Sequence, residues 1–434
     1  MEPETQIKEV DVEIAEDTKV NPLSFKYIKV VRLFYDPLGV FPVERFGEKS
    51  RLRPLRFSYP AIVILFWSAE VVFVIRNYKT MDFFLIGHCY LTNVTTGMMV
   101  IRVAMYMMKT YDDIMEEYLK SFHIVHSRAL SPYYEKLFNY EQKFSSMFAM
   151  AMMIFTCTGM LLYSSLPIYN NFHTGVFGRE KGSNLTIDLS IYYYFPFYNP
   201  VEHVVSACIL NFYLSYLCSF MTMVSDLVVY LMIFQIITHI YCLLDDLANI
   251  PKPKNFGKNS TFQHYDMIIP LAEMYDAQEN AIIQGILGRC VHHHRIIVTF
   301  ADKISSFFGP MLAYNYFYQV TSLCMQLIEI SRGDFNTFVR YVFFTLLVFS
   351  ELIFMSVIFE KVGSTSEQLI EAVYDVPWEY MSISNKRIVS VFLHRVQSPI
   401  SITAIGMVPV GLGTMTGILK TTFSYFAFLR TLNS

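Results

Sequence analysis

Cys290 and the histidines His292, His293 and His294 form the densest group of metal-ligating side chains in the sequence. Neighbouring residues on a helix point in different directions, so these side chains cannot complete a tetrahedral zinc shell by themselves. We interpret them as packing residues on a helix. The sequence also contains no glycine-rich nucleotide loop, no G-x-S-x-G motif and no H-E-x-x-H pair. We therefore expect neither an enzyme nor a bound metal or cofactor.

Glu70, Arg102, Asp226 and Glu351 are charged residues that border or interrupt otherwise apolar segments. Ionisable groups inside a membrane are costly, and they usually take part in function or pair with one another. These residues lie near segment ends or on long apolar runs. That placement favours pairing between helices over a proton or ion relay.

The composition indicates a membrane protein. The 434-residue chain is 53 % hydrophobic and only 16 % charged, whereas a typical soluble protein is about 25 % charged. Phe, Tyr and Met are abundant, with 38, 30 and 24 residues. A net charge of −3 does not favour a nucleic-acid partner. The seven cysteines form no C-x-x-C pair, which argues against a zinc module or a disulfide scaffold.

Seven segments are long and apolar enough to cross a bilayer, which takes about 20 residues as a helix. They cover residues 57–75, 83–101, 144–169, 204–225, 304–328, 335–359 and 396–419. The fourth continues as one helix through Leu247, and the seventh continues to Leu429. Prolines and glycines between Pro399 and Gly413 leave open that the seventh consists of two half-helices. The predicted fold is all-α, a polytopic membrane protein with seven transmembrane helices.

The basic residues predict the orientation, because Lys and Arg near membrane spans prefer the cytoplasm. The N-terminal segment and the even-numbered connections carry 25 of them, and the odd-numbered connections carry six. We therefore expect the N-terminus inside and the C-terminus outside. Asn184, in the sequon with Leu185 and Thr186, then lies outside, where it can be glycosylated. This orientation is opposite to that of G-protein-coupled receptors, whose D/E-R-Y and N-P-x-x-Y motifs are also missing.

The connections on the cytoplasmic side are long, and their apolar residues recur at three- and four-residue intervals. Residues 110–143 and 277–303 are predicted to be helical. Several spans should therefore extend beyond the membrane and pack together as a cytoplasmic anchor bundle, which is a candidate subunit contact.

Two predicted spans present residues that could line a ligand cavity in their outer halves. Thr156, Gly159 and Tyr163 share one face of the third span, and Phe84 and His88 form a similar pair in the second. Aromatic and Met side chains with few polar groups bind apolar small molecules. Packing between helices is the alternative interpretation of each residue.

The C-terminal third resembles the signature of insect odorant receptors. The residues that carry this resemblance are 366–369 (SEQL), Tyr374, 377–379 (PWE), 385–387 (NKR), 397–399 (QSP) and 418–430 (ILKTTFSYFAFLR). The stretch from Cys290 through His294 to Phe300 fits the same family. The combination of 377–379 (PWE) with Val410, Gly411, Thr414, Met415 and 418–420 (ILK) looks most like the moth subgroup that includes sex-pheromone receptors.

The resemblance implies an odour-binding subunit of a ligand-gated, non-selective cation channel. In that family, four subunits surround a pore lined by the seventh helix, and a divergent subunit joins the shared odorant co-receptor in a heterotetramer. The implied location is the plasma membrane of olfactory sensory neuron dendrites, surrounded by lipid. The implied parts are residues 1–56, a cytoplasmic N-terminal segment; 57–359, six transmembrane helices and the pocket; 360–402, anchor helices; and 403–434, the pore-lining helix.

The resemblance also implies site residues for a small volatile or semi-volatile ligand. The expected ligand-binding residues are Phe84, His88, Thr156, Gly159, Tyr163, Ile209, Tyr213, Tyr341 and Phe344. The expected gate comprises Phe428, Thr431 and Leu432, and Ser424 shares the helix face of Phe428 and Leu432. A membrane transporter or a gustatory-type receptor for a small apolar molecule remains the alternative function.

Overall fold

Long helices cover the predicted spans in the computed structural model, which describes residues 21–52, 54–177, 187–254, 274–331, 335–406 and 408–432. The elements in chain order are η1 (Pro22–Ser24), α2 (Lys26–Tyr35), η2 (Val43–Phe46), α3 (Leu55–Asn77), α4 (Phe83–Tyr106), α5 (Lys109–Glu117), the π-helical turn η3 (Tyr118–Phe122), η4 (Ile124–His126), η5 (Arg128–Leu130), α6 (Pro132–His173), α7 (Val204–Ala248), α8 (Ala277–Ser331), α9 (Phe335–Tyr374), η7 (Trp378–Tyr380), α10 (Ile383–Val396), β1 (Thr403–Ala404), β2 (Val408–Pro409) and α11 (Leu412–Leu432). Among the described residues, α3, α6, α7 and α8 are long and apolar enough to cross a membrane. Helices α4, α9 and α11 cover the other predicted spans.

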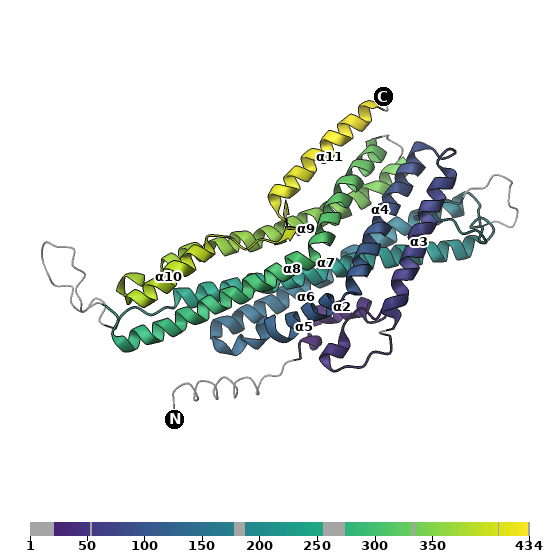
Figure 1. The fold of residues 1–434 in the computed structure, drawn as a ribbon. Coiled ribbons are helices and arrows are strands. Elements are labelled where there is room, and N and C mark those ends of the chain that lie inside the picture. The colour runs from purple at the N-terminus through teal and green to yellow at the C-terminus, as the bar shows by residue number, and fades with distance from the viewer. Residues whose placement is uncertain are drawn as a thin grey trace.

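The longest helices extend well beyond a membrane. Helices α6, α7, α8 and α9 have 42, 45, 55 and 40 residues, and a helix rises about 1.5 Å per residue. A hydrocarbon core is only about 30 Å thick. In Figure 1 these helices run past α3 and α4 toward the end of the molecule that carries α10. The prediction that the fourth span continues through Leu247 is confirmed.

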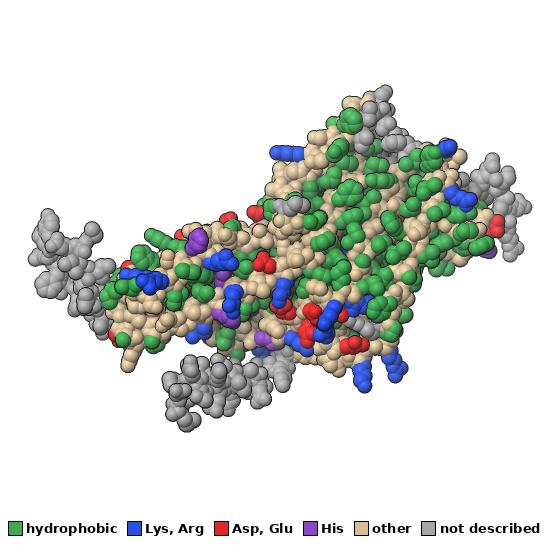
Figure 2. All heavy atoms as spheres, viewed as in Figure 1, with side chains coloured by type: hydrophobic (Ala, Val, Ile, Leu, Met, Phe, Trp, Pro, Cys, Tyr) green, Lys and Arg blue, Asp and Glu red, His purple; other side chains and the backbone are tan. Residues whose placement is uncertain are grey.

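The surface divides in the same way. On the face shown in Figure 2, hydrophobic side chains cover the part at upper right, where α3, α4 and α11 lie, whereas charged and histidine side chains gather over the lower left part. Helices of one chain thus serve two environments, a lipid-facing bundle and a polar-surfaced bundle that fits the predicted anchor.

The seventh predicted span differs from its prediction. Helix α10 ends at Val396, and α11 begins only at Leu412. Between them, β1 and β2 pair as a short antiparallel hairpin in which Thr403 faces Pro409, with Gly406 in a left-handed conformation at φ 67°. Prolines lack the N–H that a continuous helix needs. The expectation that helix covers residues 403–411 was therefore wrong. The alternative of two half-helices does not describe the segment either, because among the described residues between Gln397 and Leu419 only those of α11 are helical.

The predicted helix over residues 110–143 is also interrupted. The chain leaves α5 through the turns η3, η4 and η5, and α6 begins at Pro132. The Ser131 hydroxyl accepts a hydrogen bond from the Tyr133 N–H at 3.0 Å. A serine cap followed by proline at the first helical position is a typical helix start. These residues therefore begin a new helix instead of continuing the old one.

Neutral histidines hold part of the anchor core. His239 Nδ1 lies 3.0 Å from His293 Nε2, and His239 Nε2 donates to the Phe122 carbonyl. Burial lowers the pKa of His239 to about 4 and that of His293 to about 3. His294 packs edge-on against Phe392, and Cys290 is buried. Within the described part of the chain, no group of three or more His, Cys, Asp and Glu residues is placed to hold a metal ion.

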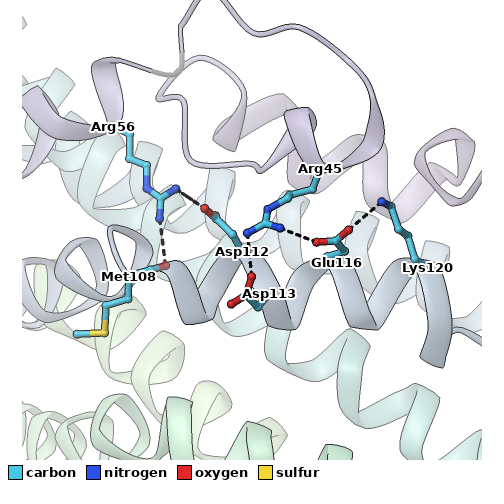
Figure 3. A network of polar contacts seen from close by, with 7 residues as sticks. All are labelled: Arg45, Arg56, Met108, Asp112, Asp113, Glu116 and Lys120. Atoms are coloured by element: carbon cyan, nitrogen blue, oxygen red, sulfur yellow. Dashed lines mark hydrogen bonds and ion pairs between the residues drawn. The ribbon is translucent and has the colours of Figure 1, made fainter.

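A cluster of ion pairs joins the N-terminal segment and the start of α3 to α5 (Figure 3). Arg56 is buried and contacts Asp112 at 2.8 Å, while its second amino group donates to the Met108 carbonyl at 3.2 Å. Arg45 pairs with Asp113 and Glu116 at 2.8 and 3.0 Å on a more exposed side. Exposed pairs contribute little to stability, so Arg56 is the main electrostatic link between the first span and α5.

Candidate functional site

A cavity of about 140 Å³ lies among α4, α6, α7, α8 and α9. Its walls are mostly apolar. The wall includes four of the residues expected to bind ligand, which are Thr156, Gly159, Tyr163 and Phe344. They come from α6 and α9, where helical spacing brings residues three and four positions apart onto one face. The structure thus brings these four together, and their contact with a ligand stays a prediction.

A hydrogen-bonded roof lies over Tyr163 at the outer end of the cavity. The hydroxyl of Tyr163 donates to the Ser190 carbonyl at 3.0 Å, and His88 Nε2 lies 3.0 Å from the same oxygen. Because a carbonyl only accepts, Nε2 carries the proton, and His88 Nδ1 accepts from Tyr341 at 2.9 Å. His88 and Tyr341 are buried. They support Tyr163 from above and do not line the cavity.

Two buried asparagines hold the outer segment that supplies this roof. Asn211, in α7, accepts from the Ser190 N–H at 2.8 Å and donates to the Ile191 carbonyl at 2.6 Å. Asn171, in α6, exchanges two hydrogen bonds with the Asp188 backbone, each 2.7 Å long. A buried amide side chain that bonds to both a backbone N–H and a backbone C=O holds a loop in place, as the backbone of a neighbouring β-strand would. The sequence analysis did not identify either residue. The only sequence signal of each residue is an amide side chain within an otherwise apolar span.

The inner end of the cavity is polar. Asp226 and Glu351 line it, together with Thr222. Arg102 is fully buried beside them, 3.0 Å from Asp226. It also donates to the Asn315 side chain at 2.9 Å and to the Thr222 carbonyl at 2.8 Å. The predicted pairing of charges between helices is therefore observed for Arg102 and Asp226.

Gly159 allows α6 and α9 to approach closely at the cavity wall. A Cβ atom at this position would overlap the end of the Leu347 side chain and lie 3.1 Å from its Cγ. Gly159 is therefore both a residue of the cavity wall and a packing residue between α6 and α9. Its contact with a ligand stays a prediction.

Ile209 and Tyr213 do not line the cavity, contrary to expectation. Their side chains are 66 % and 49 % exposed on the outside of α7. The cavity face of α7 is defined by Thr222 and Asp226. Tyr213 precedes Thr222 by two and a half turns at 3.6 residues per turn, which places it on the opposite face. The resemblance indicated the right helix, and the helical period excludes these positions.

Three further expected residues lie outside what the structure describes. Asn184 lies outside the described residues, and the side chains of Phe84 and Leu432 are likewise not described.

Ser424, Phe428 and Thr431, which are expected gate residues, have exposed side chains on α11. Ile418 and Thr422 are buried on one side of α11, and the Thr422 carbonyl accepts from Cys324 in α8. Ser424 and Thr431 are exposed, and Phe428 is 58 % exposed. Figure 1 shows the end of α11 standing apart from the other helices. Ser424 and Phe428 thus form a free face.

A sequence model described as "7tm Odorant receptor" matches residues 80–423. Odorant receptor 13a of Drosophila melanogaster is 30 % identical over 159 residues, 33 % of this chain and 38 % of that protein. Odorant receptor 46a, isoform B, of the same species is 25 % identical over 170 residues, 38 % and 44 % of the two chains. The matched region thus spans well under two thirds of these relatives.

Solved structures share the fold over nearly the whole chain. The insect olfactory receptor OR5 from Machilis hrabei in complex with eugenol superposes with a TM-score of 0.68 and 13 % identity, covering 94 % of this chain and 99 % of that one. The structure of the same receptor described without eugenol gives a TM-score of 0.69 at 14 % identity, covering 93 % and 98 %.

The contact at Gly159 predicts a coupled effect on stability. Gly159→Ala should destabilise the protein by about 1–3 kcal/mol, because the new methyl group overpacks against Leu347. Leu347→Ala in the same chain should relieve this, so the double variant should lose less stability than the sum of the single variants. Thermal unfolding in detergent measures both. Gly288→Ala is the matched control, since nothing lies near its Cβ position, and it should be neutral or stabilising by up to about 1 kcal/mol. Additive losses would contradict the packing role.

Proposed function

The chain belongs to the 7tm odorant receptor family, and on that premise we propose that it is the odour-binding subunit of a ligand-gated, non-selective cation channel. It is a multi-pass insect membrane receptor with the fold of solved olfactory receptors and is not an enzyme. The observation that carries the proposal is the apolar-walled cavity among α4, α6, α7, α8 and α9.

The proposed ligand is a compact, neutral volatile. An apolar cavity of about 150 Å³ holds a molecule such as benzene, and this one measures about 140 Å³. Among the described side chains, the cation beside it is Arg102, which is already paired with Asp226, and this disfavours a ligand with a free carboxylate. A long-chain sex pheromone would require a larger cavity, so general odour reception is favoured over pheromone reception.

The proposed channel forms around α11, together with the shared odorant co-receptor in a heterotetramer. The free face with Ser424 and Phe428 supports this, because a membrane helix that exposes one face beside its own bundle can line a pore with its neighbours. Thr431 adds a hydroxyl nearby. The anchor bundle supplies the subunit contact. The proposed location is the dendritic plasma membrane of olfactory neurons.

The proposed orientation has the N-terminus and the anchor in the cytoplasm and the C-terminus outside. The excess of 25 basic residues over six supports it. The polar surface of the anchor supports the same arrangement, since that part lies beyond the lipid-facing bundle (Figure 2). Asn184 is then an external glycosylation site.

Ligand-evoked current tests the channel proposal. Cells that express this chain with the co-receptor should respond to a panel of small volatiles with an inward cation current. Cells that express this chain alone should give little or none, because the proposed pore needs both subunits. Surface labelling controls for expression. Absence of current with every volatile, in cells with normal surface labelling of both subunits, would contradict the proposal.

Epitope accessibility tests the orientation. A tag after Ser434 should be labelled by antibody on intact cells, whereas a tag before Met1 should be labelled only after permeabilisation. The reverse pattern would place the anchor outside the cell and would contradict both the orientation and the pore arrangement.

Substitution on α11 tests the gate. Phe428→Ser should raise the unstimulated current or change relative cation permeability, because a polar group wets an apolar constriction. The ligand concentration for half-maximal response should change little. Phe423→Ser is the matched control, an exposed aromatic residue off the Ser424 and Phe428 face. A lost response with normal surface expression and unchanged permeability would instead show that Phe428 packs against a neighbour.

A further inference from the structure

The first turn of α11 is capped by a side chain from another helix. The first N–H groups of a helix have no partner within it, and a Ser, Thr, Asp or Asn just before the helix usually accepts from them. Gly411 occupies that place before α11 and has no side chain to offer. Glu360, from α9, takes this role, since its Oε2 atom accepts from the Leu412 N–H at 3.1 Å. A carboxylate also suits the positive end of the helix dipole, and the first turn of α11 contains no acidic residue of its own.

Gly411 keeps free the space beside this carboxylate. It is buried, and a Cβ atom on it would lie 2.5 Å from Glu360 Oε2, which is shorter than van der Waals contact. Any other residue at this position would push the carboxylate away from the Leu412 N–H. Such a shift costs little strain, because the displaced atom is the end of a flexible side chain. The two residues are thus matched, since the glycine leaves room for the contact that the glutamate makes.

Glu360 lies between the ligand cavity and the proposed pore. Phe354, on the same helix, lines the cavity, and the six residues from Phe354 to Glu360 span about 9 Å of helix. Leu412 begins the helix that carries Ser424 and Phe428. In Figure 1, α11 starts beside α9 and then diverges from it. The contact therefore joins the cavity helix to the start of the pore helix.

The bond reaches the backbone of α11 and not one of its side chains. A side chain can absorb a small displacement by changing its rotamer, whereas a backbone N–H moves only with the helix that contains it. The segment that leads into α11 is also held to α9, because the Ile400 N–H donates to the Ser366 hydroxyl at 2.9 Å. A displacement of α9 therefore acts on α11 at its first residue and through the segment before it.

We propose that Glu360 is a positioning residue for the gate, whose carboxylate fixes the start of α11 to α9 so that a displacement of the cavity wall on ligand binding moves the pore helix. The inference rests on the proposed channel function. It assigns a role to a residue that lies outside the cavity wall and outside the free face with Ser424 and Phe428. The expected effect of losing the contact is on channel opening.

Currents in cells that express the chain with the co-receptor test this role. The maximal ligand-evoked current, divided by the amount of surface-labelled protein, should fall about fivefold in Glu360→Ala, as expected for the loss of one helix cap. Glu360→Gln should lose less than about twofold, because its amide oxygen accepts from the same N–H. Glu367→Ala is the matched control, an exposed glutamate on the same helix, and it should leave the current unchanged.

Gly411→Ala gives an independent test of the same contact. The new methyl group displaces the carboxylate, so the current should fall by the same factor as in Glu360→Ala. Gly413→Ala is its matched control, since nothing lies near its Cβ position, and it should have no effect. The double variant with Glu360→Ala and Gly411→Ala should behave as Glu360→Ala alone, because no carboxylate remains to be displaced.

An undiminished current in Glu360→Ala at normal surface labelling would overturn the inference, and so would losses that multiply in the double variant. If Glu360→Ala does not reach the surface, the comparison of Gly411→Ala with Gly413→Ala decides the question, and equal currents in these two variants would overturn the inference. Each of these results would leave the channel function standing, since the native chain still responds. Absence of current in the native chain with every volatile of a broad panel would instead overturn the proposed function.

Discussion

The buried guanidinium of Arg102 constrains the arrangement of the membrane bundle. Its side chain has no exposure to solvent, and taking such a charge out of water costs several kcal/mol unless partners compensate. Its partners are the Thr222 carbonyl and Asp226 from α7 and Asn315 from α8. Helices α4, α7 and α8 must therefore keep their relative positions. The cavity lies beside this meeting point, with Thr222 and Asp226 in its wall.

Helices α7 and α9, which both line the cavity, extend from it into the anchor without interruption. Phe344 lines the cavity, and α9 continues from it as one helix to Tyr374. Helix α7 likewise carries Thr222 at the cavity and His239 in the anchor. A change in cavity shape can therefore act as a displacement of whole helices in the anchor, the proposed subunit contact. Neutral histidines suit that core, because charged ones would repel each other at 3.0 Å.

Long uncharged runs were sufficient to predict the spans, since the bilayer imposes length and polarity on any helix that crosses it. The break before α11 was harder to predict, because the residues from Val396 to Gly411 are uncharged and only their prolines and glycines indicate a turn. Ile209 and Tyr213 were misassigned because similarity indicates a helix more reliably than the face of that helix. Asn171 and Asn211 were missed because their partners are backbone groups of a distant loop, which no local pattern encodes.

The roof has a consequence for how long a guest stays in the cavity. Tyr163 and His88 both bond to one oxygen, the carbonyl of Ser190. A movement of that peptide group would break the two bonds together and would release Tyr163 from its support. A guest that left past Tyr163 would need that movement, and Asn211, which holds the adjacent N–H at 2.8 Å, restrains it.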